Sequence, residues 1–286
     1  MSAPPFFSVI VPISNHAGQL GEIMDSLFAQ TYKNWEAVVV CSCSSGQLAA
    51  IADVYACRDE RIRIFRGEEG KPASALNRGL RESAGGWILW LKPDDPFGPR
   101  KLATYKRWIT SYPEIALFYT DAGSVEENKR NIASAVSEHE DRLKEWQVID
   151  SLRHAWLGGI SLCVGRNALD DAGLFDEALH FGQDFDMWLR LAARYPAVRI
   201  AERTSVGCRH DVQERTTESE FRLLDCAKSG VRFLNATDFE GLFPFVDLSD
   251  RSRARAALER ALSVAADPRS MLYSAGAHPA LILRIM

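Results

Sequence analysis

Short apolar runs alternate with stretches of helical spacing in the first 120 residues of the chain. The predicted strands lie at residues 7–11, 35–40, 61–65 and 87–91, and all except the short segment 61–65 have the composition of buried strands. Between them, apolar residues such as Leu20, Ile23 and Leu27 fall on one face of a helix. Pro72 is a suitable first residue for the helix that precedes the last run. Strands that alternate with helices predict an α/β fold with a mostly parallel central sheet covered by helices.

The pattern changes after a fifth apolar run at residues 115–119. Residues 121–160 are polar, and we expect them to be irregular. Thr217 and Glu220 have the spacing of a capping box, which predicts the start of a helix. Another helix, rich in alanine and arginine, is predicted over residues 251–264. We therefore expect the chain from residue 216 onward to be a C-terminal helical appendage.

The composition is that of a globular protein, since 47% of the 286 residues are hydrophobic and 25% are charged. A chain of this length can bury a sizeable core. Its net charge of −4 argues against a nucleic-acid partner, which would require a clustered positive field. The apolar run from Phe6 to Ile13 is too short for a membrane span and lacks a positively charged leader. We interpret it as a strand and expect a cytoplasmic protein.

Six cysteines are scattered at positions 41, 43, 57, 163, 208 and 226, and none belongs to a Cys-x-x-Cys pair. This spacing predicts neither a zinc site nor a disulfide framework. We expect reduced and mostly buried thiols.

The fourth apolar run ends abruptly in the polar segment Lys92-Pro93-Asp94-Asp95. Ligands of open α/β sheets bind at the carboxyl ends of the strands, where this segment is expected to lie. Two carboxylates there suit a hard divalent cation that is shared with a phosphate-bearing substrate. Alternatively, the segment is a turn before the helix that begins near Pro99, with an aspartate as its cap. The residues themselves leave both interpretations open.

Several blocks of the sequence follow one another in a familiar order over roughly residues 7–212. The blocks are Ser8-Val-Ile-Val-Pro12, Ser26-Leu-Phe-Ala-Gln-Thr-Tyr32, Trp35-Glu-Ala-Val-Val-Val40, Asn77-Arg-Gly79, Lys92-Pro-Asp94-Asp95, Gly173-Leu-Phe-Asp176 and Gln183-Asp184-Phe-Asp186-Met-Trp-Leu-Arg190. In this order and spacing the chain resembles the inverting family 2 glycosyltransferases, which have the A-type nucleotide-sugar fold. Phe118-Tyr-Thr-Asp121 and the Gln-Asp-x-Asp form resemble the subgroup that builds bacterial O-antigen and capsular polysaccharide.

The resemblance implies transfer of a sugar, with inversion, from a nucleotide-diphosphate donor to a saccharide or a lipid-linked saccharide. A lipid-linked acceptor would bring the protein to the membrane surface as a peripheral protein. Together with the change of pattern near residue 216, the resemblance also implies three parts. Residues 1–120 would be the nucleotide-sugar-binding half, residues 121–215 the acceptor-binding half of the same domain, and residues 216–286 the helical region.

In this family, an Asp-x-Asp element at the end of the fourth strand holds Mn²⁺ or Mg²⁺ against the diphosphate. Asp94 matches the second acid of that element and Asp95 its neighbour, whereas Lys92 occupies the position of the first acid. Either Asp94 and Asp95 still hold a metal, or the Lys92 ammonium neutralises the diphosphate directly. His210 matches a histidine that contacts metal or diphosphate, although a lone histidine also fits a structural role.

The residues expected at the donor are Pro12, Ser14, Ser42, Lys71, Asn77, Lys92 and Asp94. Ser14 stands where an aromatic residue commonly packs near the base. Cys41 and Ser42 stand where the family places acids that bind the base or ribose, and Ser42 can still hydrogen-bond a base edge. Lys71 would reach a phosphate, or else it is a solvated surface lysine.

Asp184 matches the catalytic base of the family, the acid that follows Glu or Gln in the last block. An inverting transfer requires such a base to take the proton of the acceptor hydroxyl. The alternative is that Asp184 is only an acid favoured by the positive end of a helix. Asp186 cannot share its face on a helix, and we expect it to cap the helix or to pair with Arg190, four residues later.

Two other functions compete with the transferase. A relative that has lost catalysis and binds partners in polysaccharide assembly is favoured by Lys92, Cys41 and Ser14, which replace three expected donor contacts. A nucleotidyltransferase would require a glycine-rich basic loop after the first strand, and the segment His16-Ala-Gly-Gln does not supply one. The joint presence of Asp94, Asp184 and His210 favours the transferase.

Overall fold

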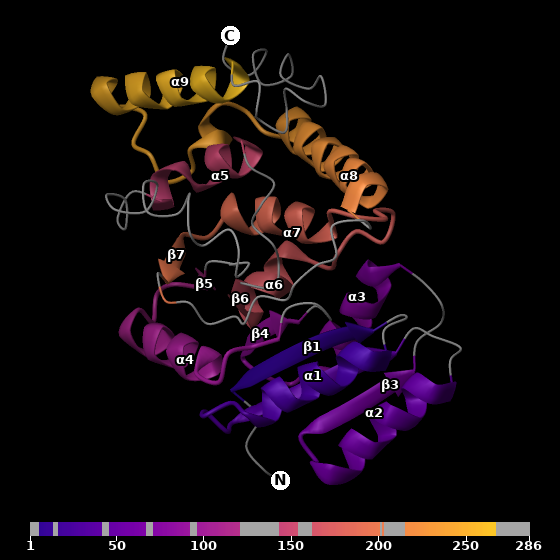
Figure 1. Ribbon diagram of the computed structural model, residues 1–286. Coiled ribbons are helices and arrows are strands. Elements are labelled where there is room, and N and C mark those ends of the chain that lie inside the picture. Colours follow the sequence, from indigo (N-terminus) through magenta and orange to yellow (C-terminus); the bar gives the residue numbers. More distant parts are fainter. Residues whose placement is uncertain are drawn as a thin grey trace. The chain divides into compact units, whose positions relative to one another are not determined.

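The computed structural model describes residues 6–13, 17–41, 46–66, 71–91, 96–120, 143–153, 162–200, 202 and 215–266 (Figure 1). Within these residues, seven strands form one sheet in the order β3-β2-β1-β4-β6-β5-β7. The strands are β1 (Phe7–Ile13), β2 (Trp35–Cys41), β3 (Ile62–Arg66), β4 (Trp87–Trp90), β5 (Leu117–Thr120), β6 (Leu162–Gly165) and β7 (Ala197–Ile200). The order places β1 between β2 and β4, and β4 is the central strand.

The first four strands are parallel, because each is followed by a helix that returns the chain to the same edge. All seven residues of β2 are buried, as expected for an inner strand covered on both faces. β6 runs antiparallel to both β4 and β5. The predicted fold class, an α/β fold with a mostly parallel sheet, is therefore confirmed.

Among the helices in the segments that connect these strands are α1 (Ala17–Phe28), α2 (Gly46–Arg58), α3 (Pro72–Glu82), α4 (Lys101–Ser111) and α6 (Arg166–Ala172). α1 packs beside α2, and α3 packs against β1 and β2. The approach of α3 is close, since a Cβ atom at Gly79 would overlap the side chain of Ile10. Glycine is thus required where the helix crosses β1.

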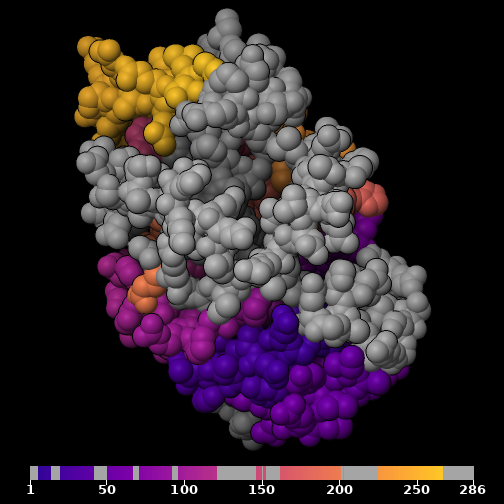
Figure 2. All heavy atoms as spheres, viewed as in Figure 1, coloured from indigo at the N-terminus to yellow at the C-terminus, as the bar shows by residue number. Residues whose placement is uncertain are grey.

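The remaining helices are α5 (Leu143–Arg153), α7 (Gln183–Ala192), α8 (Arg215–Ala236), the 3-10 helix η4 (Glu240–Leu242) and α9 (Arg251–Ala266). α7 packs against α8, and α5 packs against α7 and α9. The outer face of α9 is exposed, with Leu258 and Leu262 at the surface (Figure 2, yellow). In the described part of the chain, no helix combines the length and hydropathy needed to cross a membrane.

The chain divides into two compact units, and each unit is built from three separate stretches of the sequence. The first comprises residues 1–138, 160–177 and 199–210, and the second comprises residues 139–159, 178–198 and 211–286. The predicted division of the chain at residues 120 and 215 into donor-binding, acceptor-binding and helical parts stays a prediction. The C-terminal helices α8 and α9 belong to the same unit as α5 and α7, so they share a core with them.

Two local predictions differ from the structure. Part of the segment expected to be irregular forms α5, whose inner face carries the buried polar residues Gln147 and Ser151. Gln147 donates to the carbonyls of Ala192 and Tyr195, and Ser151 accepts from the indole of Trp188. Because these two buried residues are polar, the sequence of α5 does not show a continuous apolar face. α8 begins at Arg215, two residues before the start expected at Thr217.

The described cysteines are Cys41, Cys57, Cys163 and Cys226, and none of these four is in a disulfide. Three of them are buried and Cys57 is exposed, in agreement with the expectation of mostly buried thiols. Burial raises the pKa of the Cys163 thiol well above its ordinary value, although the nearby Lys101 ammonium lowers it. Cys163 is therefore a protonated core residue and not a nucleophile. Cys43 and Cys208 lie outside the described residues.

Candidate active site

Four of the residues predicted for the site lie in the described part of the chain: Pro12, Lys71, Asn77 and Asp184. The other predicted residues, Ser14, Ser42, Lys92, Asp94, Asp95 and His210, lie outside it. Among the described residues, no three His, Cys, Asp or Glu side chains gather closely enough to hold a metal. The metal site assigned to Asp94, Asp95 and His210 accordingly stays a prediction.

The carboxyl ends of the parallel strands define one edge of the sheet. Ile13 at the end of β1 pairs with Cys41 at the end of β2, and β4 ends nearby, with Trp90 opposite Ile10. In the sequence, Ser14, Ser42 and Asp94 follow the ends of β1, β2 and β4, and α/β proteins bind ligands at this edge of the sheet. This topology supports the grouping of the predicted donor residues.

Pro12 explains why β4 separates from β1 at this edge. The carbonyl of Ile10 accepts the N–H of Leu91 at 2.8 Å, which places the next contact between β1 and β4 at the nitrogen of Pro12. Proline has no N–H, so this ladder cannot continue beyond Leu91. β2 still pairs with Pro12 through Val40. The last described contact between β4 and β1 is therefore the one at Leu91.

Lys71 immediately precedes α3. Its backbone is extended, with φ −70° and ψ 153°, and Pro72 follows it at the start of the helix. The amide and hydroxyl of Ser74 both donate to the carbonyl of Lys71, at 3.0 and 2.8 Å, which secures the first turn. A lysine beside the N-terminus of a helix combines two features that attract phosphate. Phosphate binding by Lys71 nevertheless stays a prediction.

Asn77 lies on the inner face of α3 and is only 1% exposed. Its amide nitrogen donates to the carbonyl of Phe175 at 3.0 Å and to the carboxylate of Glu177 at 2.7 Å. Its amide oxygen accepts the N–H of Phe175 at 2.8 Å. The ring of Phe175 packs edge-on against Trp90, the last residue of β4, with the ring centroids 5.3 Å apart. Asn77 thus holds the segment before Glu177 beside the end of β4, and its contact with a donor stays a prediction.

Asp184 lies in the first turn of α7 and is 8% exposed. The helix begins after Gly182, whose backbone is left-handed with φ 71°. Asp186 forms an ion pair with Arg190 at 2.9 Å, as predicted, and Arg232 of α8 lies 3.9 Å from its other oxygen. These arginines account for Asp186 as a structural acid. Asp184 remains the candidate for the catalytic base.

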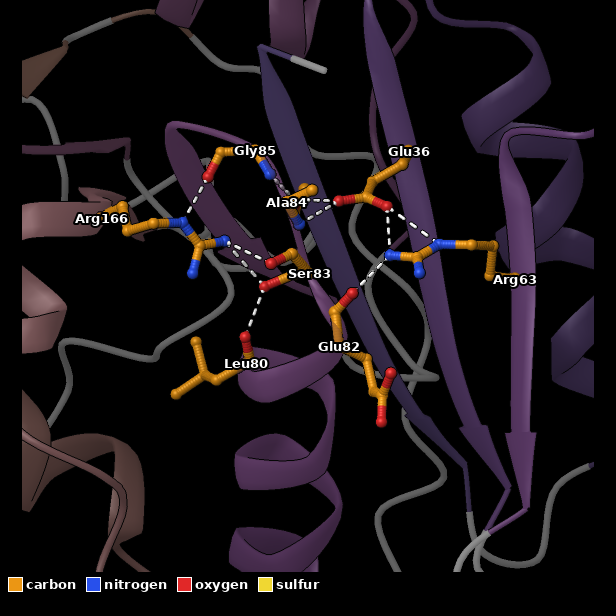
Figure 3. Close-up of polar contacts among 9 residues, drawn as sticks. Glu36, Arg63, Leu80, Glu82, Ser83, Ala84, Gly85 and Arg166 are labelled. Atoms are coloured by element: carbon orange, nitrogen blue, oxygen red, sulfur yellow. Dashed lines mark hydrogen bonds and ion pairs between the residues drawn. The ribbon is translucent and has the colours of Figure 1, made fainter. Parts of the chain in front are cut away.

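A polar cluster at the opposite edge of the sheet was not predicted from the sequence (Figure 3). Glu36, at the start of β2, is 7% exposed, and one of its oxygens accepts the Ser8 hydroxyl and the Ala84 N–H, both at 2.6 Å. Its other oxygen pairs with Arg63 at 2.6 Å. Burial raises the pKa of Glu36, but the hydrogen bonds from Ser8, Ala84 and Arg63 together bring it below its ordinary value. Glu36 is therefore a buried anion, and both of its carboxylate oxygens have hydrogen-bond partners.

The same cluster attaches β6 to the turn before β4 (Figure 3). Arg166, which follows β6, donates to the carbonyl of Gly85 at 2.7 Å and to the hydroxyl of Ser83 at 2.9 Å. The N–H of Gly85 donates to the hydroxyl of Ser8 at 2.7 Å. A Cβ atom at Gly85 would come within 2.6 Å of the Ser8 nitrogen. The cluster fixes the connection between α3 and β4, and therefore the strand that leads to Asp94.

The sequence profile of glycosyl transferase family 2 matches residues 8–170. The chain belongs to this family. The predicted family and the predicted class of enzyme, a glycosyltransferase, are thereby confirmed. The matched range extends over β1 to β6 and includes all the segments that carry the predicted donor residues except His210.

Glycosyltransferases are also found among its relatives. An uncharacterized glycosyltransferase of Rickettsia typhi is 29% identical over 218 residues, which cover 74% of this chain and 67% of the relative. The O-antigen biosynthesis protein RfbC of Myxococcus xanthus is 29% identical over 197 residues, which cover 67% of this chain and 15% of RfbC. The chain thus spans about two thirds of the first relative and a small part of the second.

Solved glycosyltransferases share the fold. S. aureus TarS 1–349, in complex with UDP-GlcNAc, has a TM-score of 0.66 at 18% identity, covering 96% of this chain and 88% of that one. The mannosyltransferase PcManGT from Pyrobaculum calidifontis, in complex with GDP-Man and Mn²⁺, has a TM-score of 0.60 at 19% identity, covering 98% and 86%. At these identities the likeness concerns the fold alone. It confirms the predicted A-type glycosyltransferase fold.

Proposed function

We propose that this glycosyltransferase moves a sugar from a nucleotide-diphosphate donor to a saccharide or lipid-linked saccharide acceptor, with inversion. The observation that carries the proposal is the family match over residues 8–170, which coincides with the parallel strands and their ligand-binding edge. TarS and PcManGT, which share the fold, bind UDP-GlcNAc and GDP-Man. Both ligands belong to the proposed donor class.

The donor diphosphate is proposed to bind at the carboxyl ends of β1, β2 and β4. Pro12 belongs to β1, and Ser14 and Ser42 follow β1 and β2. Lys92 and Asp94 follow β4. Lys71 and the N-terminus of α3 add positive charge for a phosphate. Asn77 supports this edge through Phe175 and Trp90, in addition to the donor contact implied by the resemblance.

A divalent ion, Mn²⁺ or Mg²⁺, is proposed as the cofactor, with Asp94, Asp95 and His210 as its ligands. Carboxylate oxygens and an imidazole are a suitable donor set for Mn²⁺, and PcManGT was solved with that ion. When bound, the ion would offset the negative charge of the diphosphate. Lys92, which replaces one acid of the family's element, contributes positive charge to the same end.

The reaction is proposed as a single displacement. The carboxylate of Asp184 takes the proton from the acceptor hydroxyl while that oxygen attacks the anomeric carbon of the donor sugar. The new carbon–oxygen bond forms as the bond to the diphosphate breaks, and the nucleoside diphosphate leaves with its electron pair. Attack opposite to the leaving group inverts the anomeric centre. Asp184 holds the proton at the end of the step.

The acceptor is proposed to belong to a bacterial surface polysaccharide. The similarity to RfbC, an O-antigen biosynthesis protein, supports this class. A saccharide on a lipid carrier would require the protein to work at a membrane surface, and the location is proposed to be cytoplasmic and peripheral.

Calorimetric titration with UDP, GDP, CDP and dTDP, with and without Mn²⁺, tests the donor site. We expect one nucleotide to bind much more tightly than the others. The bound nucleotide then identifies the donor series for an assay of sugar transfer, in which the anomeric configuration of the product is read by NMR. Absence of binding by every nucleotide would contradict the proposal.

A catalytically inactive scaffold is the second candidate function, because Ser14, Cys41 and Lys92 depart from the family's donor contacts. The two candidates give different results in the same assay. A scaffold binds its partner without turnover, and replacement of Asp184 leaves that binding unchanged. A transferase releases nucleoside diphosphate in proportion to the sugar transferred.

A further inference from the structure

The turn that leads into α7 lies directly on α8. Gly182, the last residue of this turn, has φ 71°, and a Cβ atom there would lie 3.0 Å from the sulfur and 3.1 Å from the nitrogen of Cys226. Glycine is required at this position for its left-handed backbone and for the close contact with α8. The path of the chain into α7 is therefore set by a helix that follows it by some forty residues in the sequence.

Asp225, the residue before Cys226, binds the same turn. One of its oxygens accepts the backbone N–H of Phe181 at 3.2 Å, and the other pairs with Lys228 at 2.9 Å. The Asp225 side chain is 13% exposed. Burial raises its pKa, but the hydrogen bonds from Lys228 and from the backbone of Phe181 and His180 bring the pKa below its ordinary value. Asp225 is therefore an anion, and its carboxylate binds the backbone of the turn at Phe181.

Because the loop residues Phe181 and Gly182 are held against α8, the start of α7 is fixed as well. The carbonyl of Gly182 accepts the N–H of Asp186 at 3.0 Å, so the helix starts from the residue that packs on Cys226. Arg232, two turns after Asp225 on α8, approaches the side chain of Asp186 at 3.9 Å. Asp184 lies between these two attachments. Its position thus depends on α8 on both sides.

We propose that Asp225 is a positioning residue for the catalytic base Asp184, and that α8 is in this way part of the catalytic apparatus of the transferase. The inference rests on the proposed function, because it requires Asp184 to be the base. A general base acts only within hydrogen-bonding distance of the proton that it removes, and a displacement of about 1 Å can lower a rate by about 10²-fold. A hydrogen bond that holds the backbone three residues before the base is suited to prevent such a displacement.

The test compares Asp225→Leu, Asp225→Asn and a matched control in the full-length protein. Leucine removes the acceptor for the Phe181 N–H, whereas the amide oxygen of asparagine can still accept it. Asp238 is the control, because it also accepts a backbone N–H, that of Gly241 at 2.8 Å, in the same unit but outside the turn. Circular dichroism and thermal unfolding establish that each variant is folded. If Asp225→Leu is insoluble, Asp225→Ser, which is too short to reach Phe181, replaces it.

We expect Asp225→Leu to lower kcat by about tenfold or more while the donor KM changes by less than about twofold. Asp225→Asn should retain most of the turnover, and Asp238→Leu should behave as the original protein. The decisive measurement repeats Asp225→Leu in the Asp184→Asn background. There it should cause no further loss beyond about twofold, because a positioning residue acts only through the base.

Three results would overturn the inference. They are an unchanged kcat in Asp225→Leu, an equal loss in Asp225→Asn, and a full additional loss in the Asp184→Asn background, which would indicate a general structural role. The failure of the proposed function appears differently. If Asp184→Asn itself keeps full turnover, Asp184 is not the base, and there is no base for Asp225 to position.

Discussion

The side chain of Asn77 hydrogen-bonds both the N–H and the C=O of Phe175, at 2.8 and 3.0 Å. Both residues are buried, at 1% and 2% exposure, and the two bonds join α3 to a segment almost a hundred residues later. An amide side chain can serve both partners at once, because it carries a donor on its nitrogen and an acceptor on its oxygen. This relationship explains the asparagine of the Asn77-Arg-Gly79 block in structural terms.

Asn77→Ala is expected to destabilise the protein by about 1–3 kcal/mol, because it leaves the buried N–H and C=O of Phe175 without a partner. Urea unfolding measures the change. Asn34→Ala is the control, since Asn34 also accepts a backbone N–H, that of Phe6 at 3.2 Å, but at an exposed position. Equal effects of the two substitutions would show that burial of the Asn77 contact does not matter.

Glu36→Gln is expected to lower stability at pH 7 and to have little effect under acidic conditions. The pKa of Glu36 is lowered in the folded protein, so its stabilising contribution is complete above the unfolded value of about 4.3 and is lost as pH falls through the folded value. The difference in Tm between Glu36→Gln and the original protein should therefore shrink as pH decreases below that range. Glu60, an exposed acid, provides the control substitution Glu60→Gln. A difference that is the same at pH 7 and pH 3.5 would contradict the assignment.

Asp184→Asn is expected to reduce turnover by about 10²-fold or more, with unchanged nucleotide affinity, because the amide keeps the shape and cannot accept the proton. The substitution Asp186→Asn in the same helix turn is the comparison. It removes the charge that pairs with Arg190 and should reduce stability more than turnover. Steady-state kinetics and nucleotide titration separate the two. Full activity of Asp184→Asn would exclude Asp184 as the base.

Lys92 is expected to replace part of the metal's contribution. A fixed cation beside the diphosphate offsets the charge that a divalent ion would offset, and it repels that ion from Asp94. Nucleoside diphosphate binding should thus depend weakly on Mn²⁺ or Mg²⁺, and Lys92→Asp should make it strongly metal-dependent. Titration calorimetry with and without chelator measures this. The idea fails if chelator abolishes binding to the original protein while Lys92→Ala leaves the metal-dependent affinity unaltered.

The elements that follow hydrophobic periodicity were predictable from the sequence. β1, β2 and β4 are inner strands buried on both faces, so each appears as a continuous apolar run. α5 was not predictable, because buried Gln147 and Ser151 interrupt its apolar face and find their partners only in the folded unit. β6 was not predicted, because it contributes only three consecutive apolar residues, Leu162, Cys163 and Val164, before Gly165.

The candidate site divides in a similar way. The Asp186–Arg190 pair follows from local spacing on one helix, which the sequence displays, whereas Asp184 was selected through the resemblance to the family. Asp225 was missed because its partner, the N–H of Phe181, is a backbone group far away in the sequence. A side chain that binds a distant backbone leaves no pattern of residue types. The double contact of Asn77 with Phe175 was hidden for the same reason.

The position of β6 in the sheet has a consequence for the order in which the growing chain can fold. The strands β1 to β4 can pair with one another as soon as they are synthesised, but β5 pairs with β6, which follows it by more than forty residues. Until β6 emerges from the ribosome, the free edge of β4 is available to strands of other chains. Arg166, immediately after β6, then fastens the late strand to the turn before β4. Nascent chains whose synthesis stalls between β5 and β6 should accordingly depend on a chaperone more than chains that already contain β6.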